Sequence, residues 1–462
     1  MPATPAPVAA TAPAAAPPQP AAVSPVASPS ASAAASASAS PAAPASPDWL
    51  TYQHDAARSG RTTGAYNPAS TTLLWESDPL DGQIYAQVLV AGARVFVATE
   101  NDTIYALDAV TGRAVWSQHL GEPVPRSALP CGNIDPTGIT GTPVIDSAAG
   151  VLYAVDYLRQ PPHHELVALD LNSGAVKSHQ SIDPPGANPL PLQQRGALAL
   201  ANQTVYVPFG GLFGDCGDYH GWIVAASLAD GAERGAYQVP THREGAIWSA
   251  PAIGPTGDLY AATGNGDSTT DFDQSNTVLR LSPQLKLLDY FAPRDWADMN
   301  RRDADLGSTG PALLDNGLVL QIGKTGIGYL LRSDGLGKIG GEIMSASLCA
   351  GGAYGGAAHS GSMAYVACRD GLYAVRVQAQ AFNVMWRGPQ FSAGAPVITD
   401  DAVWTLDDGT SSLYAFNPQD GSVLFRAPAG QASNPPHFLS PAAAGGRIFQ
   451  SRGRTIAAYG TK

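Results

Sequence analysis

The chain has 462 residues, of which 50 are glycine, 39 are proline and 14% are charged, and its formal net charge is −12. An acidic chain with a sequence pI near 5.1 lacks the basic surface that nucleic-acid binding requires, so we expect no nucleic-acid partner. No uninterrupted apolar run is long enough to cross a bilayer, so we also expect no transmembrane segment.

Residues 1–47 consist almost wholly of Ala, Pro, Ser, Thr and Val and carry no charged side chain. Because they offer no large apolar side chain to bury, we predict a disordered spacer ahead of a folded domain at residues 48–462. The stretch lacks the basic start and Leu-rich core of a signal peptide. Spacers of this kind often link an anchor to a domain outside the cytoplasm, so we expect an extracytoplasmic protein that is secreted, periplasmic or anchored at the cell surface. An uncleaved cytosolic tail is the alternative.

The first part of the domain contains four short segments with alternating apolar and polar residues. They lie at 85–90, 94–99, 103–108 and 113–117 and are separated by turns rich in Gly, Asn and Asp. Alternation with a period of two predicts β-strands. Four successive antiparallel strands are typical of one blade of a β-propeller.

This unit recurs along the chain at intervals of roughly 40–60 residues. We expect first strands to begin near Tyr85, Gly141, Arg195, Ser249, Ser308, Gly355, Gly394 and Ser440. The last unit contains only three strands, whereas residues 71–77 form a strand ahead of the first unit. Pairing that strand with the last unit would close the ring and remove a free sheet edge. The sequence therefore predicts an all-β, eight-bladed propeller of four-stranded antiparallel blades closed by an N-terminal strand, with seven blades as the alternative.

Four cysteines fall on connections at one face of this propeller: Cys131, Cys216, Cys349 and Cys368. The connection between blades and the loop between second and third strands share a face because the strands alternate in direction. Cys349 and Cys368 are close in sequence and are predicted to pair, which leaves Cys131 with Cys216. Two disulfides would indicate an oxidising compartment; four buried free thiols are the alternative.

The same topology brings five chemically distinctive residues to that face. Arg195, Trp248 and Asp305 each precede a first strand, and Asn265 and Lys324 each end a second strand. A flat aromatic ring, a carboxylate, an amide and two cations would then converge on one concavity, where ligands commonly bind. Taken singly, each has a structural explanation: Trp248 as a wedge between blades, Asp305 and Asn265 as turn caps, and Lys324 as a solvated lysine.

The stretch Ala106–Trp116 resembles the tryptophan-docking repeat of the quinoprotein dehydrogenases, which use pyrroloquinoline quinone (PQQ), and of their non-enzymatic relatives. The segment ending in Asn265 is similar to the family motif Thr-Gly-Asn, whose Asn binds Ca²⁺ beside the quinone. The resemblance implies that Asp305 is the catalytic base and a metal ligand, and that Lys324 contacts the quinone oxygens and assists catalysis. It also implies that Trp248 floors the quinone ring.

Three further features of this face bear on the resemblance. Arg195 offers a second cation for the cofactor. The family enzymes carry two adjacent cysteines over the quinone, but here Cys131 is followed by glycine. Their metal-binding glutamate is not found in the corresponding loop, where Asp215 or Asp218 would have to replace it.

Two hypotheses follow. In the first, the chain is a PQQ- and Ca²⁺-dependent dehydrogenase that oxidises an alcohol or sugar-like substrate. It would pass electrons to an external acceptor, since the sequence has no haem-attachment motif. In the second, the chain is a cofactor-free scaffold that binds protein or polysaccharide at the cell surface.

Overall fold

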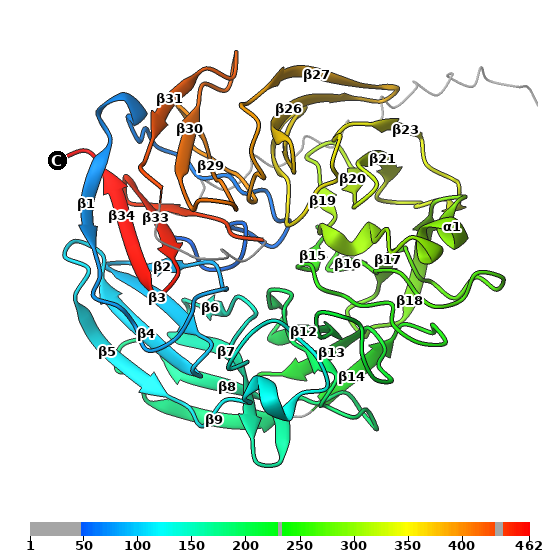
Figure 1. Cartoon of the computed structure of the whole chain (residues 1–462), viewed down its shortest axis with the longest axis horizontal. Helices are drawn as coiled ribbons and strands as arrows, with labels where there is room; N and C mark the ends of the chain where they lie inside the picture. The colour runs from blue at the N-terminus through cyan, green and yellow to red at the C-terminus, as the bar shows by residue number, and fades with distance from the viewer. Residues whose placement is uncertain (1–47, 230–232, 430–437) are drawn as a thin grey trace, which may run out of the picture. The chain divides into compact units, whose positions relative to one another are not determined.

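The computed structural model of the chain describes residues 48–229, 233–429 and 438–462. The predicted spacer at 1–47 lies outside the described residues. Within them, the structure is almost entirely β, and no helix is long and apolar enough to span a membrane. The strands form eight sheets arranged as blades around an axis (Figure 1).

Blades one to four follow one another along the chain, and each is numbered here from its innermost strand outwards. Blade one comprises β2 (Leu89–Ala91), β3 (Arg94–Thr99), β4 (Thr103–Asp108) and β5 (Ala114–His119). Blade two comprises β6 (Val144–Asp146), β7 (Val151–Arg159), β8 (Pro162–Asp170) and β9 (Val176–Ser181). Blade three comprises β11 (Ala199–Ala201), β12 (Thr204–Gly211), β13 (Trp222–Ser227) and β14 (Glu233–Gln238), with β10 (Leu192–Gln193) also paired to β12. Blade four comprises β15 (Ala252–Ile253), β16 (Leu259–Ala262), β17 (Val278–Leu281) and β18 (Leu287–Ala292), with β22 (Lys338–Ile339) added in parallel to β18.

The remaining blades repeat the pattern. Blade five comprises β19 (Ala312–Leu313), β20 (Leu318–Ile322), β21 (Ile327–Arg332) and β23 (Met344–Ser347). Blade six comprises β24 (Ala358–Ser360), β25 (Met363–Cys368), β26 (Gly371–Gln378) and β27 (Ala381–Arg387). Blade seven comprises β28 (Val397–Ile398), β29 (Val403–Leu406), β30 (Leu413–Phe416) and β31 (Val423–Arg426). Blade eight comprises β32 (Ala442–Ala444), β33 (Arg447–Arg452), β34 (Thr455–Gly460) and the N-terminal β1 (Thr72–Glu76).

The ring is closed by its two ends. Strand β1 pairs antiparallel with β34, placing Thr72 opposite Gly460 and Glu76 opposite Ala457. The prediction of eight blades closed by an N-terminal strand is therefore confirmed. The innermost strands begin two to four residues later than the sequence pattern suggests. Some of the residues just before them bond to the neighbouring blade: the Gln87 side-chain amide, ahead of blade one, donates to the Pro441 carbonyl, ahead of blade eight, at 2.6 Å.

Neighbouring blades are locked together by tryptophans packed on glycine turns. A Cβ on Gly112, Gly174 or Gly421 would lie within 2.6 Å of an indole ring, and each of these glycines has a positive φ. Only glycine combines that backbone conformation with so close a contact. Each tryptophan lies on the outermost strand of one blade and its glycine in the following blade. The pairs are Trp75 with Gly112, Trp116 with Gly174, and Trp386 with Gly421. This packing is the physical basis of the repeat seen in the sequence.

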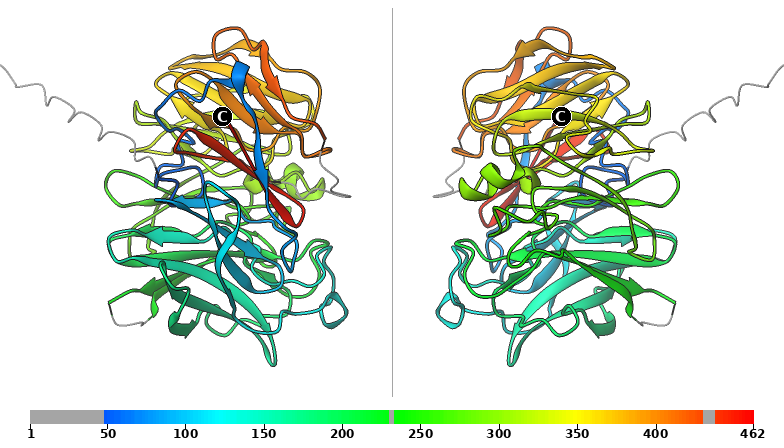
Figure 2. Two further views of the ribbon diagram at one scale, coloured as in Figure 1. Left: turned by 90° about the vertical axis from the view of Figure 1, so that its left-hand side faces the viewer. Right: turned by 90° about the vertical axis from the view of Figure 1, so that its right-hand side faces the viewer.

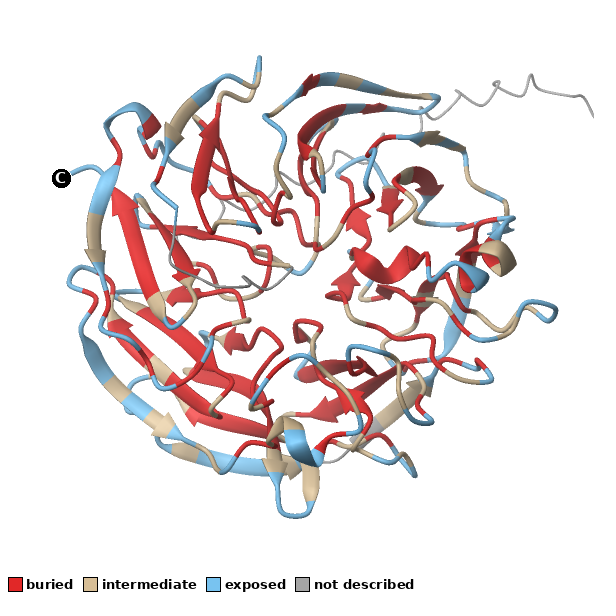
Figure 3. Ribbon diagram, in the orientation of Figure 1, coloured by how far each residue is buried: buried red, intermediate tan, exposed pale blue. Residues whose placement is uncertain are grey.

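Burial follows the same radial order. The inner and middle strands are mostly buried, whereas the outermost strand of each blade has exposed positions (Figure 3). In blade one, every residue of β4 is buried or half-buried, whereas most residues of β5 are exposed. The cores therefore lie between adjacent blades.

Residues 49–62, which precede β1, run along the inner ends of the blades (Figures 1 and 2). The segment forms hydrogen bonds with seven of the eight blades. Its partners are Val90 (blade one), Ile145 (two), Leu198 (three), Ile253 (four), His359 (six), Ile398 (seven) and Ser440 (eight). Most of these bonds join backbone groups at the ends of innermost strands. A segment that reaches so many blades from the inside must occupy the axis of the ring.

Candidate functional site

Asp305 is the buried centre of the candidate site. It follows α1 (Trp296–Arg301) and immediately precedes the short helix η3 (Leu306–Ser308) ahead of blade five, without a side-chain hydrogen bond to that helix. Its Oδ1 accepts a hydrogen bond from the backbone N–H of Asn265 at 2.7 Å, and its Oδ2 forms an ion pair with the Lys324 ammonium. The ends of blades four and five therefore hold this carboxylate from two sides. A Cβ at Gly264 would come within 2.4 Å of Oδ1, so the glycine of the Thr-Gly-Asn motif makes this approach sterically feasible.

Lys324 lies at the end of the second strand of blade five, as the sequence pattern predicted. Besides Asp305, its Nζ contacts Asp303 Oδ1 at 2.8 Å and lies 5.8 Å from the centre of the Trp248 ring. Burial raises the pKa of Asp305, although the Lys324 charge opposes this. Burial lowers the pKa of Lys324, but the Asp305 and Asp303 charges outweigh it and raise the pKa overall. Asp305 is thereby made a better proton acceptor than an exposed carboxylate.

Asn265 connects Asp305 to a glutamate that the sequence analysis did not identify. The Asn265 side-chain amide donates to Glu244 Oε2 at 3.1 Å, and Glu244 Oε1 contacts Arg243 Nη2 at 2.6 Å. Glu244 is only 6% exposed, and its burial raises its pKa, with Arg243 opposing. The sequence feature that could have identified Glu244 is its position four residues before Trp248. The loop around Asp215, where the family resemblance places the metal-binding glutamate, contains no glutamate.

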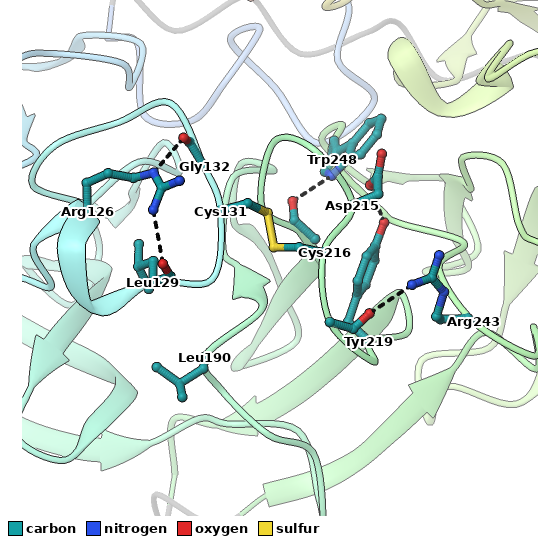
Figure 4. Close-up of a disulfide and its surroundings, with 12 residues drawn as sticks. Arg126, Leu129, Cys131, Gly132, Leu190, Asp215, Cys216, Tyr219, Arg243 and Trp248 are labelled. Carbon is teal, nitrogen blue, oxygen red and sulfur yellow. Dashed lines mark hydrogen bonds between the residues drawn. A yellow bond between two sulfur atoms is a disulfide. The ribbon is translucent and has the colours of Figure 1, made fainter.

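The two aspartates proposed in place of that glutamate lie in different surroundings. Asp215 accepts a hydrogen bond from the Tyr219 hydroxyl at 2.5 Å (Figure 4). Burial raises the pKa of Asp215, with Asp303 adding to the effect and Lys324 opposing it, so Asp215 faces the same group of charges. Asp218 is exposed and lines a separate cavity of about 760 Å³ that also includes Tyr219. Asp215 therefore interacts electrostatically with the cluster, whereas Asp218 lines the other cavity.

Both predicted disulfides are present in the structure. Cys131 and Cys216, whose Cα atoms are 6.0 Å apart, join the link between blades one and two to a loop of blade three (Figure 4). Cys349 and Cys368, with Cα atoms 5.3 Å apart, join the link between blades five and six to the second strand of blade six. In Figure 4 the first disulfide lies close to Trp248 and Asp215, so it fixes loops that border the candidate site.

Arg195 and Trp248 line a small pocket at the axis. The Arg195 guanidinium carbon lies 4.6 Å from the centre of the Phe438 ring and 5.6 Å from that of Tyr85. With Trp248 and with Tyr52 of the N-terminal segment, these residues enclose a volume of about 30 Å³. The Trp248 indole donates to the Gly211 carbonyl at 3.2 Å, which fixes its ring. Trp248 thus connects the axial pocket with the Lys324 side of the cluster.

The side chains of the cluster suit a calcium ion. Ca²⁺ prefers carboxylate and amide oxygens, and Asp305, Asn265, Glu244 and Asp215 supply them. Among the described residues, the three carboxylates do not all lie within 4.8 Å of one another, so a bound ion would have to draw them together.

The space at the axis does not suit a quinone. A pocket of about 30 Å³ holds one or two water molecules, whereas pockets for cofactor-sized ligands measure about 300–1,000 Å³. Among the described residues, the pocket that Trp248, Arg195 and Phe438 line is therefore too small for a fused three-ring cofactor. The oxygen atoms of the cluster suit the metal that the family resemblance implies, whereas this pocket does not suit the quinone.

Comparison with known proteins agrees with the fold. Residues 59–288 match the family model described as outer membrane protein assembly factor BamB. The quinohemoprotein alcohol dehydrogenase of Comamonas testosteroni has a TM-score of 0.69 and 14% identity, over 90% of this chain and 80% of that one. A europium-containing methanol dehydrogenase has a TM-score of 0.68 and 14% identity, over 90% and 98%. BamB from Moraxella catarrhalis has a TM-score of 0.58 and 13% identity, over 84% and 99%. No curated protein sequence matches the chain significantly.

Proposed function

Because the chain belongs to the family of PQQ-binding-like β-propellers, we propose that it is an extracytoplasmic, Ca²⁺-binding propeller that recognises a polysaccharide and holds no quinone. The observation that carries this proposal is a contrast within one face. Carboxylate and amide oxygens gather around Asp305, whereas the pocket beside Trp248 measures only about 30 Å³.

The cluster offers the groups that bind a hydroxyl-rich ligand. Carboxylate and amide oxygens accept hydrogen bonds from hydroxyl groups, and a Ca²⁺ ion accepts hydroxyl oxygens as ligands, as it does other oxygens. The half-buried ring of Trp248 supplies an apolar face that can pack against a sugar ring. Because a polysaccharide can bind across the mouth of the face, it does not require a deep axial pocket.

The two disulfides support a location outside the cytoplasm. Disulfides persist in secreted, periplasmic and cell-surface proteins, whereas cytosolic thiols are kept reduced. Neither Cys131–Cys216 nor Cys349–Cys368 leaves a free thiol, and all four cysteines of the chain are paired.

A second candidate is the dehydrogenase, favoured by the contacts that join Asn265, Asp305, Lys324 and Trp248. Asp305 would then remove the proton from an alcohol hydroxyl as general base. Lys324 would hold that carboxylate in place and balance its charge. PQQ would supply the two-electron acceptor when bound. This activity requires Arg195 and Phe438 to move away from Trp248 and open the axial pocket.

Calorimetric titration of purified residues 48–462 distinguishes the candidates. The protein would be titrated first with Ca²⁺, and then with PQQ and with polysaccharides in the presence and absence of Ca²⁺. Asn265→Ala should lose Ca²⁺ binding, whereas Asp271→Ala, in an exposed acidic loop, serves as the matched control and should keep it.

Each outcome has a clear meaning. Ca²⁺ and polysaccharide binding without PQQ binding would support the proposed function. PQQ binding that depends on Ca²⁺, with dye-linked alcohol oxidation lost in Asp305→Ala, would replace it with the dehydrogenase. A protein that binds no Ca²⁺ at all would refute the metal site on which both candidates depend.

A further inference from the structure

A second group of potential metal ligands lies in blade two, away from the Asp305 cluster. Asp156 on β7, Glu165 on β8 and His179 on β9 each offer one ligand atom, and these three atoms lie within 4.8 Å of one another. No other group of three His, Cys, Asp or Glu side chains in the described part of the chain meets this distance. The three strands are adjacent in one sheet (Figure 1).

The strand register explains why these side chains meet. Asp156 pairs directly with Glu165 across β7 and β8, so both point to the same face of the sheet. On the next strand, His179 pairs with Val167, two residues from Glu165 along β8. Side chains two residues apart on a strand share a face, so His179 is the diagonal neighbour of Glu165. The group is therefore fixed by the sheet and not by a mobile loop.

One member of the group, Asp156, has a carboxylate oxygen that accepts no hydrogen bond from the described residues. Asp156 is fully buried, and its Oδ2 has no hydrogen-bond partner among the described residues. Its Oδ1 accepts only the backbone N–H of Glu165, at 3.2 Å. A buried carboxylate oxygen without a partner is unfavourable. A second carboxylate beside it adds electrostatic repulsion. A cation at this point would relieve the uncompensated charge.

A fourth side chain, His163, lies outside this group of three but approaches Glu165 with its ring already oriented. His163 Nδ1 lies 2.5 Å from the Pro161 carbonyl and donates to it, which leaves the lone pair on Nε2. That Nε2 lies 3.4 Å from Glu165 Oε1, while His179 Nδ1 lies 3.0 Å from Glu165 Oε2. Metal-binding histidines commonly donate their second ring N–H to a carbonyl in this way. Two imidazoles thus flank one carboxylate.

We propose that Asp156, Glu165, His163 and His179 form a binding site for a divalent transition-metal ion of the Zn²⁺ type. Two imidazole nitrogens and two carboxylate oxygens make a mixed set of four, which suits zinc and not calcium or magnesium. The ion would join β7, β8 and β9 near the tip of the β7–β8 hairpin. It would therefore stabilise blade two, independently of any ligand at the Asp305 cluster.

The test uses untagged, metal-free protein and Zn²⁺ as the probe. Calorimetry should find one Zn²⁺ per chain, and Co²⁺ in its place should give the visible absorption bands of a four-coordinate ion. The variants His179→Ala and Glu165→Gln should weaken Zn²⁺ binding by more than about tenfold. The control His242→Ala removes another exposed histidine, which contacts Asp267 Oδ2 at 2.7 Å outside the group. It should bind Zn²⁺ like the unmodified protein.

A thermal measurement keeps the test valid if a variant is less stable. His179 is 44% exposed, so its removal should leave the fold intact, and Zn²⁺ should raise the Tm of the unmodified protein and of His242→Ala but not of His179→Ala. The proposal would be overturned if the chain took up no Zn²⁺. It would equally be overturned if His179→Ala and Glu165→Gln bound Zn²⁺ as tightly as the control.

Discussion

Arg58 should be the residue on which the N-terminal segment most depends. Its side chain is 4% exposed and donates to three backbone carbonyls, those of Tyr52 at 2.8 Å, Leu198 at 3.0 Å and Pro251 at 2.9 Å. These acceptors belong to the segment itself, to blade three and to blade four. Because the guanidinium is buried, its pKa is lowered to about 10, but it stays charged at neutral pH. Arg58 thus ties the segment to two blades.

Arg58→Met keeps much of the apolar volume and leaves those carbonyls without a donor. Each hydrogen bond to a charged group is worth about 1.5–3 kcal/mol, partly offset because the variant no longer buries a charge. We therefore expect a net loss of about 3 kcal/mol. For a domain of about 400 residues the unfolding entropy is near 0.8 kcal/mol per kelvin, so Tm should fall by about 3–4 °C.

Scanning calorimetry measures this directly, with Arg61→Met as the matched control. Arg61 lies in the same segment, but its side chain is 37% exposed and makes a hydrogen bond to Ser360 at 3.0 Å. Such an exposed contact contributes less than about 1 kcal/mol. Equal Tm values for the two variants would refute the argument that Arg58 anchors the segment.

Two further predictions concern single buried positions. Burial raises the pKa of Glu100 to about 7, so the folded chain binds a proton more tightly than the unfolded one; its contribution to stability is present below about pH 4.5 and lost as pH rises to 7. Glu100→Gln should therefore stabilise the protein at pH 8 by at most about 3 kcal/mol and make Tm depend less on pH. If Tm varied with pH in the variant as it does in the unmodified protein, the prediction would be wrong. Gly264→Ala places a Cβ 2.4 Å from Asp305 Oδ1 and should weaken Ca²⁺ binding and lower Tm. In the control Gly335→Ala the added Cβ meets no atom within 4 Å, so neither quantity should change. Equal calorimetric results for both variants would contradict the proposed packing.

The repeat made the ring predictable from the sequence. Each blade carries its own alternating strands and glycine turns, so the pattern is local and is read again every few dozen residues. The closing strand was predictable for the same reason, because the last unit visibly lacked a fourth strand. Residues 49–62 were not predictable. They contain no repeat and form no strand of their own, and their bonds go to residues hundreds of positions away, such as His359 and Ser440.

The candidate site was likewise predictable from the sequence only in part. Asn265 and Lys324 closely follow second strands, and Asp305 lies in the connection ahead of blade five. Blade topology alone places these segments on one face. The position of Glu244 at the site was not predicted, because it depends on a backbone conformation with a φ of +72°. No pattern of alternating residues indicates such a conformation. That conformation turns the chain so that Glu244 meets Asn265.

The N-terminal segment also links the closure of the ring to the size of the axial pocket. Tyr52 belongs to this segment and lines the pocket with Arg195 and Trp248. It packs among Ala197, Ala250 and Ala395 from three different blades, which leaves room for one tyrosine and little else. The small residues at these positions therefore suit a ring whose axis is filled by its own chain. The space for a cofactor is then limited by the same packing that holds the blades together, which favours ligand binding across the face over binding along the axis.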